Sequence, residues 1–194
     1  LPRDVDEVLN YVRAMNHGLG RLPELPVSVR LIREIHAELM RGVRGGRLQP
    51  GELRTSQNWI GPAGCTLATA TFVPPPPHEL MATLGNLEKF LHEARHSVPL
   101  LVRCGLAHAQ FETIHPFLDG NGRLGRLMIV LYLVSFRLLA KPALYLSDFF
   151  ERHKGEYYDH LMAVRTTSRL SPWLDFFLVG VCETAAASIQ IFKD

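Results

Sequence analysis

The sequence predicts an all-α domain of about seven helices with one small β-hairpin. Apolar residues recur at helical spacing through most of the 194-residue chain. Residues 58–74 differ, because they are rich in threonine and β-branched side chains, interrupted by glycine and proline, and free of charge. Hydrophobic residues make up 47% of the chain and charged residues 21%, as in ordinary soluble domains with a buried core. A chain of this length is expected to form one domain.

Two helices are expected before the hairpin. The first, over 4–19, carries an apolar stripe at helical spacing: Val5, Val8, Leu9, Val12 and Met15. The second begins after Pro26, with Ser28 as its cap. Residues 42–56 are rich in glycine and arginine and are expected to form a loop. The prolines at 74–77 end the hairpin in stiff polyproline geometry.

Five further helices are expected after the hairpin, over 78–94, 98–114, 123–140, 147–165 and 171–192. The helix at 123–140 is the most apolar of them. Its run LMIVLYLV is the longest apolar run in the chain, yet it is too short to span a bilayer. We therefore expect this helix to be buried in the core.

The composition argues against several classes of protein. A net charge of +2 is too balanced to predict a nucleic-acid-binding surface. The three cysteines, Cys65, Cys104 and Cys182, form no CxxC pair, so neither a disulfide framework nor a cysteine zinc site is indicated. The first residues contain acids and lack the cleavage pattern of a signal peptide. We expect a cytoplasmic protein that acts neither on membranes nor on nucleic acid.

Residues 115–126, HPFLDGNGRLGR, concentrate the chemistry of the chain. A Gly-Asn-Gly run at 120–122 precedes the helix that is expected to begin near Arg123. Glycine and asparagine tolerate positive φ, so successive backbone N–H groups can form an anion-binding nest, to which the helix N-terminus adds free N–H groups. Arg123 and Arg126 lie three residues apart in the first turn, and guanidinium groups match phosphate oxygens. The stretch therefore predicts a site for two or more phosphates.

An acid and a base stand beside this phosphate site. The Asp119 carboxylate would repel bound phosphates unless a divalent cation lay between them, and Mg²⁺ is commonly held by one or two carboxylates together with substrate phosphates. His115 has an imidazole suited to act as a general base near neutral pH. A base, a metal and cations together favour nucleotidyl or phosphoryl transfer to a hydroxyl. The bland alternative is a glycine-containing loop with solvated arginines, and a GxGxxR pattern alone would not exclude it.

The whole string resembles the signature of the Fic family (filamentation induced by cAMP), His-x-Phe-x-Asp/Glu-Gly-Asn-Gly-Arg-x-x-Arg, and it matches at every specified position. The resemblance extends over 51–62, 72–77, 107–117 and 145–161, and so spans nearly the whole chain. It implies a Fic fold over 1–194, with a flap at about 58–74 and the active-site loop at 115–126. Members of this family mostly transfer AMP from ATP to a Ser, Thr or Tyr hydroxyl of a protein, themselves included, and release pyrophosphate.

The resemblance also implies roles for particular residues. His115 would deprotonate the target hydroxyl and Asp119 would bind Mg²⁺. The nucleotide would be held by the residues that follow: Gly120, Asn121, Gly122, Arg123, Leu124, Gly125 and Arg126. Tyr157 and Tyr158 resemble an aromatic pair near the adenine, although ordinary core aromatics on a helix would give the same pattern.

The hairpin resembles the flap of this family. An exposed edge at Thr71, Phe72 and Val73 could hold the backbone of a target protein by strand addition, which would place a target hydroxyl over His115. The terminal helices could also pair in a homodimer.

One departure from the family concerns inhibition. Related proteins often carry a helix with a Ser/Thr-x-x-x-Glu-Gly/Asn motif, whose glutamate engages the second arginine of the signature. Ser147 and Glu151 have that spacing, but Arg152 follows them. We expect that an inhibitory segment was removed upstream of the chain or is supplied by another polypeptide, and that a winged-helix domain could follow it downstream.

Two rival functions stay open at this stage. The same fold can support UMP transfer, phosphorylation or AMP removal, although phosphorylating relatives carry Lys where Gly122 stands here. A nucleotide-binding regulator without turnover is the second rival, and an intact His115 argues against it because binding alone would not need a base.

Overall fold

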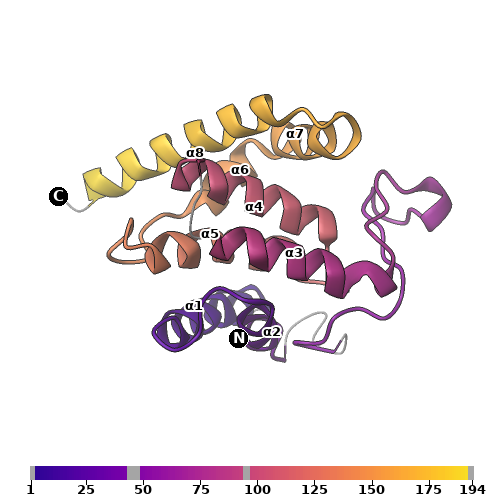
Figure 1. The fold of residues 1–194 in the computed structure, drawn as a ribbon, viewed down its shortest axis with the longest axis horizontal. Coiled ribbons are helices and arrows are strands. Elements are labelled where there is room, and N and C mark those ends of the chain that lie inside the picture. The colour runs from indigo at the N-terminus through magenta and orange to yellow at the C-terminus, as the bar shows by residue number, and fades with distance from the viewer. Residues whose placement is uncertain (1–2, 43–48, 94–96, 192–194) are drawn as a thin grey trace.

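The computed structural model describes residues 3–42, 49–93 and 97–191, and these residues form eight α-helices and two short 3₁₀ helices (Figure 1). The helices before the active-site loop are α1 (Arg3–Arg21), α2 (Val29–Leu39), η1 (Leu67–Thr69), η2 (Pro77–Glu79), α3 (Leu80–His92) and α4 (Leu100–Ile114). Those after it are α5 (Asn121–Ser135), α6 (Leu146–Arg152), α7 (Lys154–Thr167) and α8 (Leu170–Ile191). The all-α prediction is confirmed.

Helices α4 and α5 form the centre of the bundle. The layer of α1 and α2 lies on one side of them, and α6, α7 and α8 cover the other side (Figure 1). Because α4 and α5 are buried on most of their surface, neither shows a one-sided apolar stripe. The short loop that joins these two central helices carries the signature, so the motif is held by the best-packed part of the molecule.

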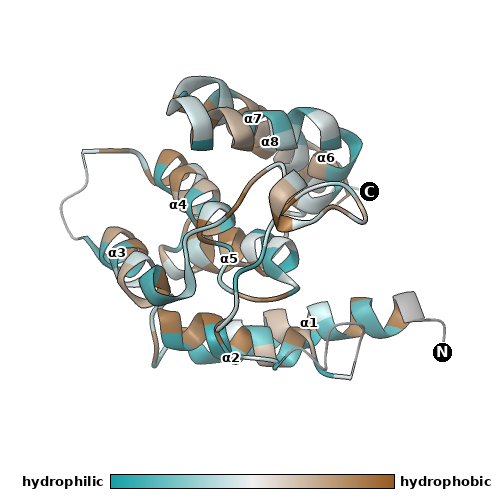
Figure 2. Ribbon diagram, turned by 90° about the vertical axis from the view of Figure 1, so that its right-hand side faces the viewer, coloured by the Kyte–Doolittle hydropathy of each residue, from teal (hydrophilic) through white to brown (hydrophobic). Residues whose placement is uncertain are grey.

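The predicted helix at 4–19 is formed as α1, and most of its apolar stripe is exposed. Met15 is buried, but four other residues of the stripe are exposed by 37–63%: Val5, Val8, Leu9 and Val12. The buried face of α1 instead carries Asn10 and Ala14, and Asn10 donates its side-chain amide to the Arg41 carbonyl at 2.6 Å. Apolar and polar residues alternate along this helix (Figure 2). The face that packs against the rest of the bundle is not the face that carries most of the stripe.

The predicted helix at 147–165 is two helices, α6 and α7, which meet at His153. The bend brings Phe149, Phe150 and Tyr157 into one aromatic cluster with Trp173 and Phe176 of α8, with ring centroids 4.6–6.4 Å apart. Phe150 and Tyr157 lie on either side of this bend, and both rings lie near the Trp173 ring, which is fully buried.

Helix α8 is long and apolar enough to cross a membrane by length and composition. Helices that pack in a core share this property, and α8 contacts α4, α6 and α7. Its first half is buried through Trp173, Phe176 and Phe177, while Ile189 and Ile191 near its end are exposed. The end of α8 extends past the body of the bundle in Figure 1.

The predicted hairpin at 58–74 is not formed in this fully described segment. A single antiparallel bridge joins Ile60 and Phe72, with N–H···O distances of 2.8 and 3.0 Å. The ladder cannot extend in either direction, because Pro62 and Pro74 each lack the N–H that the next rung would need. The segment is an exposed, irregular loop that projects from the side of the bundle (Figure 1), and we call residues 58–74 the flap.

Candidate active site

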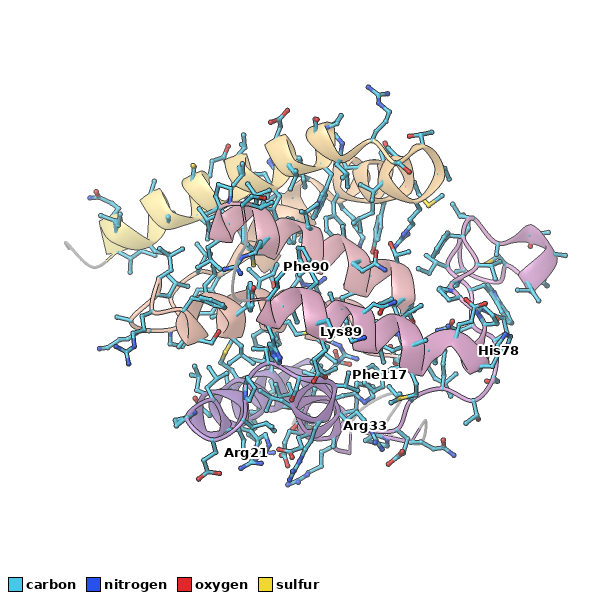
Figure 3. The ribbon with its side chains drawn as sticks, in the orientation of Figure 1. Arg21, Arg33, His78, Lys89, Phe90 and Phe117 are labelled. Atoms are coloured by element: carbon cyan, nitrogen blue, oxygen red, sulfur yellow. The ribbon has the colours of Figure 1, made fainter. Side chains whose placement is uncertain are left out.

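The loop between α4 and α5 begins at His115 and ends at Gly120. His115 caps α4 in the left-handed region, with φ 48° and ψ 61°, while its N–H still donates to the Phe111 carbonyl. This conformation turns the chain sharply at the end of the helix. Phe117, labelled in Figure 3, is fully buried and stacks on the His36 ring with centroids 3.7 Å apart, so it pins the loop to the bundle.

The His115 imidazole lies in a partly closed position. Its side chain is 21% exposed, but its Nδ1 is fully buried and has no hydrogen-bond partner among the described residues. Burial lowers the pKa of His115 to about 4, and the positive charge of Arg165 acts in the same direction. The ring is therefore neutral at pH 7 and has a free lone pair, as a general base requires.

Two side chains from the base of the flap hold the backbone of this loop. Arg54 is buried and donates Nε to the His115 carbonyl at 3.0 Å, Nη1 to the Ser56 carbonyl, and Nη2 to the Pro75 carbonyl. Asn58 donates its amide to the carbonyls of His115 and Phe117 at 3.2 and 3.0 Å. The His115 carbonyl thus has two donors, and the position of the base is fixed through its own backbone.

Gly120 and the start of α5 form the anion site. Gly120 has φ 79°, and a Cβ there would lie 2.7 Å from Met40 Sδ, so the position requires glycine. Helix α5 begins at Asn121, two residues before the predicted start. Residues 121–123 therefore present the free N–H groups of a first helical turn, preceded by one left-handed residue.

The Asn121 side chain belongs to the loop and not to the ligand site. It is buried, its Oδ1 accepts from the Phe117 N–H at 2.9 Å, and its Nδ2 donates to the Phe117 carbonyl at 2.8 Å. Leu124 is fully buried and its N–H donates to the Gly120 carbonyl, so it offers no group to a nucleotide. Gly125 faces α4 and allows the two central helices to approach each other.

The two arginines of the motif have different neighbours. Arg123 pairs with Glu7 of α1 at 3.0 Å, and its guanidinium lies 3.9 Å from Asp119. Arg126 donates Nε to Ser147 of α6 at 3.2 Å. Both cations border the start of α5, one on its α1 side and the other on its α6 side.

The Asp119 carboxylate is fit to take a cation that arrives with a nucleotide. Its side chain is 43% exposed, and Oδ1 accepts from the Gly120 N–H at 2.6 Å. The described residues contain no group of three or more His, Cys, Asp or Glu that could hold a metal ion by themselves. One accessible carboxylate beside an anion site matches the way in which Mg²⁺ is bound together with phosphates.

His36 of α2 holds the backbone of Asp119 in place. Its Nδ1 accepts from the Gly51 N–H at 2.8 Å, so the ring is neutral and Nε2 donates to the Asp119 carbonyl at 3.0 Å. Burial lowers the pKa of His36, which favours this neutral form.

The predicted tyrosine pair is split between core and surface. Tyr157 is buried and its hydroxyl lies 2.9 Å from His108 Nε2, within the aromatic cluster. Tyr158 is 49% exposed and its ring centroid lies 5.3 Å from that of Tyr157. Of the two tyrosines, Tyr158 is therefore the one whose ring is exposed to solvent.

The flap residues alternate in exposure. Thr71 and Val73 are exposed, while Phe72 is partly buried beneath the Arg165 guanidinium, 4.4 Å from the ring centroid. Arg165 also donates Nη2 to the Glu112 carbonyl at 2.9 Å. One side chain of α7 therefore contacts both the flap and the end of α4.

Sequence reasoning missed four residues that build this site, namely His36, Arg54, Glu112 and Arg165. Three of them reach the loop from distant parts of the chain, so no local pattern marked them. Glu112 could have been found, because it is an acid inside an apolar helix and stands three residues before His115, on the same helix face.

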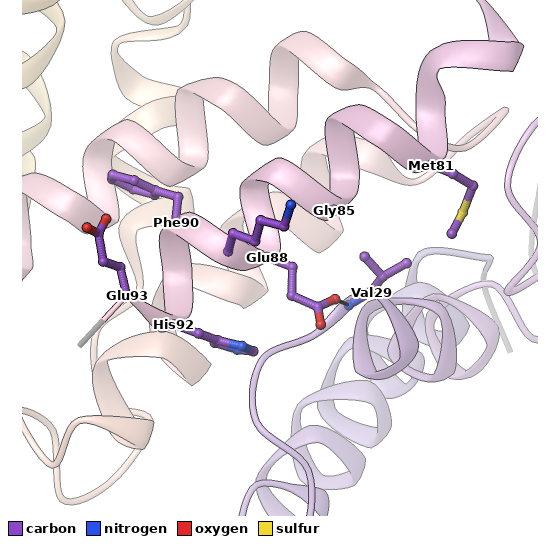
Figure 4. A pocket seen from close by; sticks show the side chains of 8 residues that line it. Val29, Met81, Gly85, Glu88, Phe90, His92 and Glu93 are labelled. Atoms are coloured by element: carbon purple, nitrogen blue, oxygen red, sulfur yellow. Dashed lines mark hydrogen bonds between the residues drawn. The ribbon is translucent and has the colours of Figure 1, made fainter. Parts of the chain in front are cut away.

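A surface groove elsewhere on the molecule contains none of the predicted site residues. It lies between the start of α2 and α3, and Glu88 at its floor accepts from the Val29 N–H at 2.7 Å (Figure 4). The predicted phosphate site is thus separate from this groove.

Together, fold and site define a helical domain in which a neutral histidine lies beside the free N–H groups of a helix N-terminus and two arginines. The sequence pattern of the Fic/DOC family matches residues 26–133, and the chain belongs to this family. Among curated proteins, the protein adenylyltransferases Fic of Drosophila grimshawi and Drosophila melanogaster are 29% and 28% identical over 126 residues, which is 64% of this chain. The chain spans about a quarter of the length of these relatives, 24% and 23%.

Solved structures share the fold. A Fic family protein from Desulfovibrio desulfuricans G20 superposes with a TM-score of 0.81 at 22% identity, covering 100% of this chain and 56% of that one. Fic-1 from C. elegans gives 0.69 at 22% identity, covering 100% and 53%. BepC from Bartonella tribocorum, solved with bound AMPPNP, gives 0.54 at 15% identity, covering 87% and 84%.

Proposed function

We propose that this domain transfers AMP from Mg-ATP to a hydroxyl group of a protein and releases pyrophosphate. One observation carries the proposal: a single short loop joins a neutral, partly exposed histidine at the end of α4 to the free N–H groups at the start of α5. The names of the curated relatives, protein adenylyltransferase, and the AMPPNP bound to BepC support the same reading.

The chemistry follows from the residues of the loop. The N–H groups of 121–123 and the guanidinium groups of Arg123 and Arg126 would hold the triphosphate. His115 would take the proton of the target hydroxyl at Nε2 while the hydroxyl oxygen bonds to the α-phosphorus and the bond to the β-phosphate breaks. Asp119 would hold Mg²⁺, which neutralises phosphate charge when bound. Because the loop is already hydrogen-bonded in place, little reorganisation is needed.

The flap is the candidate site for the target protein. The exposed backbone beside Thr71 and Val73 would pair with an extended target segment, and the Arg165–Phe72 contact would keep the flap near the loop. Tyr158 is the ring that could contact the adenine, with Tyr157 packed behind it. We further place the protein in the cytoplasm, which agrees with the free state of Cys65, Cys104 and Cys182.

Transfer of label from α-³²P-ATP tests the proposal. Wild type, His115→Ala and the matched control His78→Ala would be incubated with Mg²⁺ and a cytosolic lysate; His78 has an 80% exposed side chain. We expect protein labelling in wild type and control, and a loss of roughly 10²- to 10⁴-fold in His115→Ala. Label from γ-³²P-ATP alone would identify a kinase and overturn the proposal. ATP binding without label from either position would favour the rival function, a nucleotide-binding regulator without turnover.

A further inference from the structure

Glu112 is the one carboxylate among the buried polar side chains of the described residues. Its side chain is 7% exposed, and it lies on the last full turn of α4, three residues before His115. Burying a carboxyl group is costly unless it is neutralised or paired, so such a group needs an explanation. The function proposed above assigns it none.

Two fully buried polar atoms of Glu112 and His115 lie here without hydrogen bonds. Glu112 Oε1 and His115 Nδ1 are both fully buried and both lack a partner among the described residues. Glu112 Oε2 lies 4.0 Å from His115 Nδ1, close enough for an ion pair and about 1 Å too far for a hydrogen bond. A small rotation of either side chain would close that gap.

The packing around Glu112 leaves room for the carboxyl group. A Cβ at Gly125 of α5 would lie 2.5 Å from Glu112 Oε1, so any other residue there would displace the acid. The Glu112 backbone carbonyl also lies near the ring and raises the pKa of His115, but it already accepts from Arg165 at 2.9 Å. The side-chain carboxylate is the stronger acceptor for an Nδ1–H, because hydrogen bonds to an ionised group are stronger than those to a neutral carbonyl.

We propose, as an extension that rests on the proposed AMP transfer, that Glu112 is the positioning residue of the base. Its carboxylate would accept the Nδ1–H of His115 and hold the tautomer in which Nε2 has its lone pair. When the O–H bond of the target breaks and its proton moves to Nε2, the carboxylate would stabilise the imidazolium ion. The Nδ1–H bond stays intact, and the extra proton leaves Nε2 for water after pyrophosphate departs. A carboxylate plays the same part in a catalytic triad, where it orients the imidazole and stabilises its charged form.

Titratable and charged groups on the elements packed around Glu112 and His115 influence the pKa values of the pair. Arg126 of α5 and Arg165 of α7 face Glu112, Tyr157 of α7 lies near it, and His108 lies one turn before it on α4. Arg54 and Asp119 also act on His115. Burial raises the pKa of Glu112 to about 7 despite the two arginines. The acid therefore changes from its neutral to its charged form across neutral pH, and the pair titrates as a unit.

An NMR titration of the His115 ring tests the pair without any substrate. The ¹⁵N-histidine spectra of the wild type, Glu112→Gln and the exposed control Glu183→Gln would be followed from pH 3.5 to 8.5, with His115→Asn to assign the signal. We expect the wild-type ring to show two steps, near pH 4 and near pH 7, and Glu112→Gln to lose the step near pH 7. Identical curves in wild type and Glu112→Gln would overturn the proposal.

Kinetics then tests the catalytic consequence. In the wild type, kcat should rise as pH increases through about 7, because the carboxylate form is the one that stabilises the imidazolium. Glu112→Gln should lower kcat by about 10- to 100-fold at pH 8, flatten this rise and leave KM for ATP unchanged. Glu112→Asp should recover part of the rate and the rise. An increase in KM for ATP with unchanged kcat would contradict a role at the base.

These two measurements separate the inference from the function on which it rests. Loss of the step near pH 7 together with no AMP transfer by any variant would reject the proposed function and keep the Glu112–His115 pair. AMP transfer together with the same His115 titration curve in wild type and Glu112→Gln would support the proposed function and reject the Glu112–His115 pair. Because Gln has nearly the shape of Glu and removes a buried acid, Glu112→Gln should unfold at no lower urea concentration than wild type.

Discussion

The active-site loop and the flap have different tasks in the proposed function, and they are built in opposite ways. In the loop, the His115 carbonyl has two donors, Asn121 uses its whole side-chain amide on Phe117, and Phe117 is fully buried. The flap has one β-bridge and mostly exposed residues. Under the proposed function the loop would hold a base and phosphates in fixed positions, whereas the flap would accommodate a partner.

Two arginines connect these regions. Arg54 bonds the His115 carbonyl on the loop and the Pro75 carbonyl at the end of the flap. Arg165 contacts the Phe72 ring and the Glu112 carbonyl. These contacts fix both ends of the flap relative to the base, while most side chains between them are exposed. A fixed base beside an exposed flap would suit the proposed transfer to a macromolecular target.

Gly120→Ala should break the rigid side of this comparison most severely. The residue has φ 79°, and its new Cβ would lie 2.7 Å from Met40 Sδ and 3.3 Å from His36 Nε2. We expect a loss of roughly 2–4 kcal/mol in the free energy of unfolding, from the left-handed backbone and the overpacking together. Transfer activity should fall with it, because His36 and the start of α5 would shift. Urea denaturation and a label-transfer assay measure the two effects.

Gly85→Ala is the matched control for this variant. Gly85 lies inside α3, and a Cβ there would meet nothing within 4 Å. Because alanine favours helices over glycine by up to about 1 kcal/mol, this variant should be slightly stabilised and fully active. Equal behaviour of the two variants would mean that Gly120 has no special conformation in solution.

Arg54→Lys should weaken the connection between loop and flap. Lysine keeps the positive charge but cannot bond the carbonyls of His115, Ser56 and Pro75 at once. We expect a loss of about 2–3 kcal/mol in the free energy of unfolding and a larger drop in kcat than in ATP affinity. Arg30→Lys is the control, since Arg30 is 72% exposed and pairs only with Glu34 on its own helix. A stable Arg54→Lys with wild-type kcat would show that the loop needs no such anchor.

The roles proposed for the signature could be predicted from local residue types. The residues that support it from distant parts of the chain could not. Residues 115–126 carry their function in residue types and spacing, so His115, Asp119 and the anion site could be placed from the sequence. Arg54 and His36 reach the same loop from 61 and 83 residues away, to His115 and Asp119 respectively. No period or spacing in one sequence reports such a contact.

The hairpin prediction failed for an identifiable physical reason, and the stripe of α1 shows what helical spacing leaves undetermined. Threonine and β-branched residues favour a strand, but the prolines at 62 and 74 remove the donors that a second rung needs, so only the Ile60–Phe72 bridge forms. The apolar stripe of α1 has helical spacing, yet packing buried the adjacent face through Asn10 and Ala14. Spacing predicts that a helix forms, whereas the partner surface decides which face it buries.

Val73→Pro tests the adaptable side of the comparison and should have the smallest effect on the molecule itself. Residue 73 is 44% exposed and follows the only bridge of the flap, so proline should change the free energy of unfolding by less than about 0.5 kcal/mol. Proline removes the N–H that strand addition would offer to a target backbone, and KM for the protein target should therefore rise several-fold while KM for ATP stays constant.

Val73→Ala removes the side chain but keeps that N–H, and it should bind the target nearly as well as wild type. If both variants lose target binding equally, the side chain of residue 73 is the contact and strand addition is wrong. If KM for ATP rises in Val73→Pro, the flap contributes to the nucleotide site. In that case the separation between a rigid loop for the nucleotide and an adaptable flap for the protein would not hold.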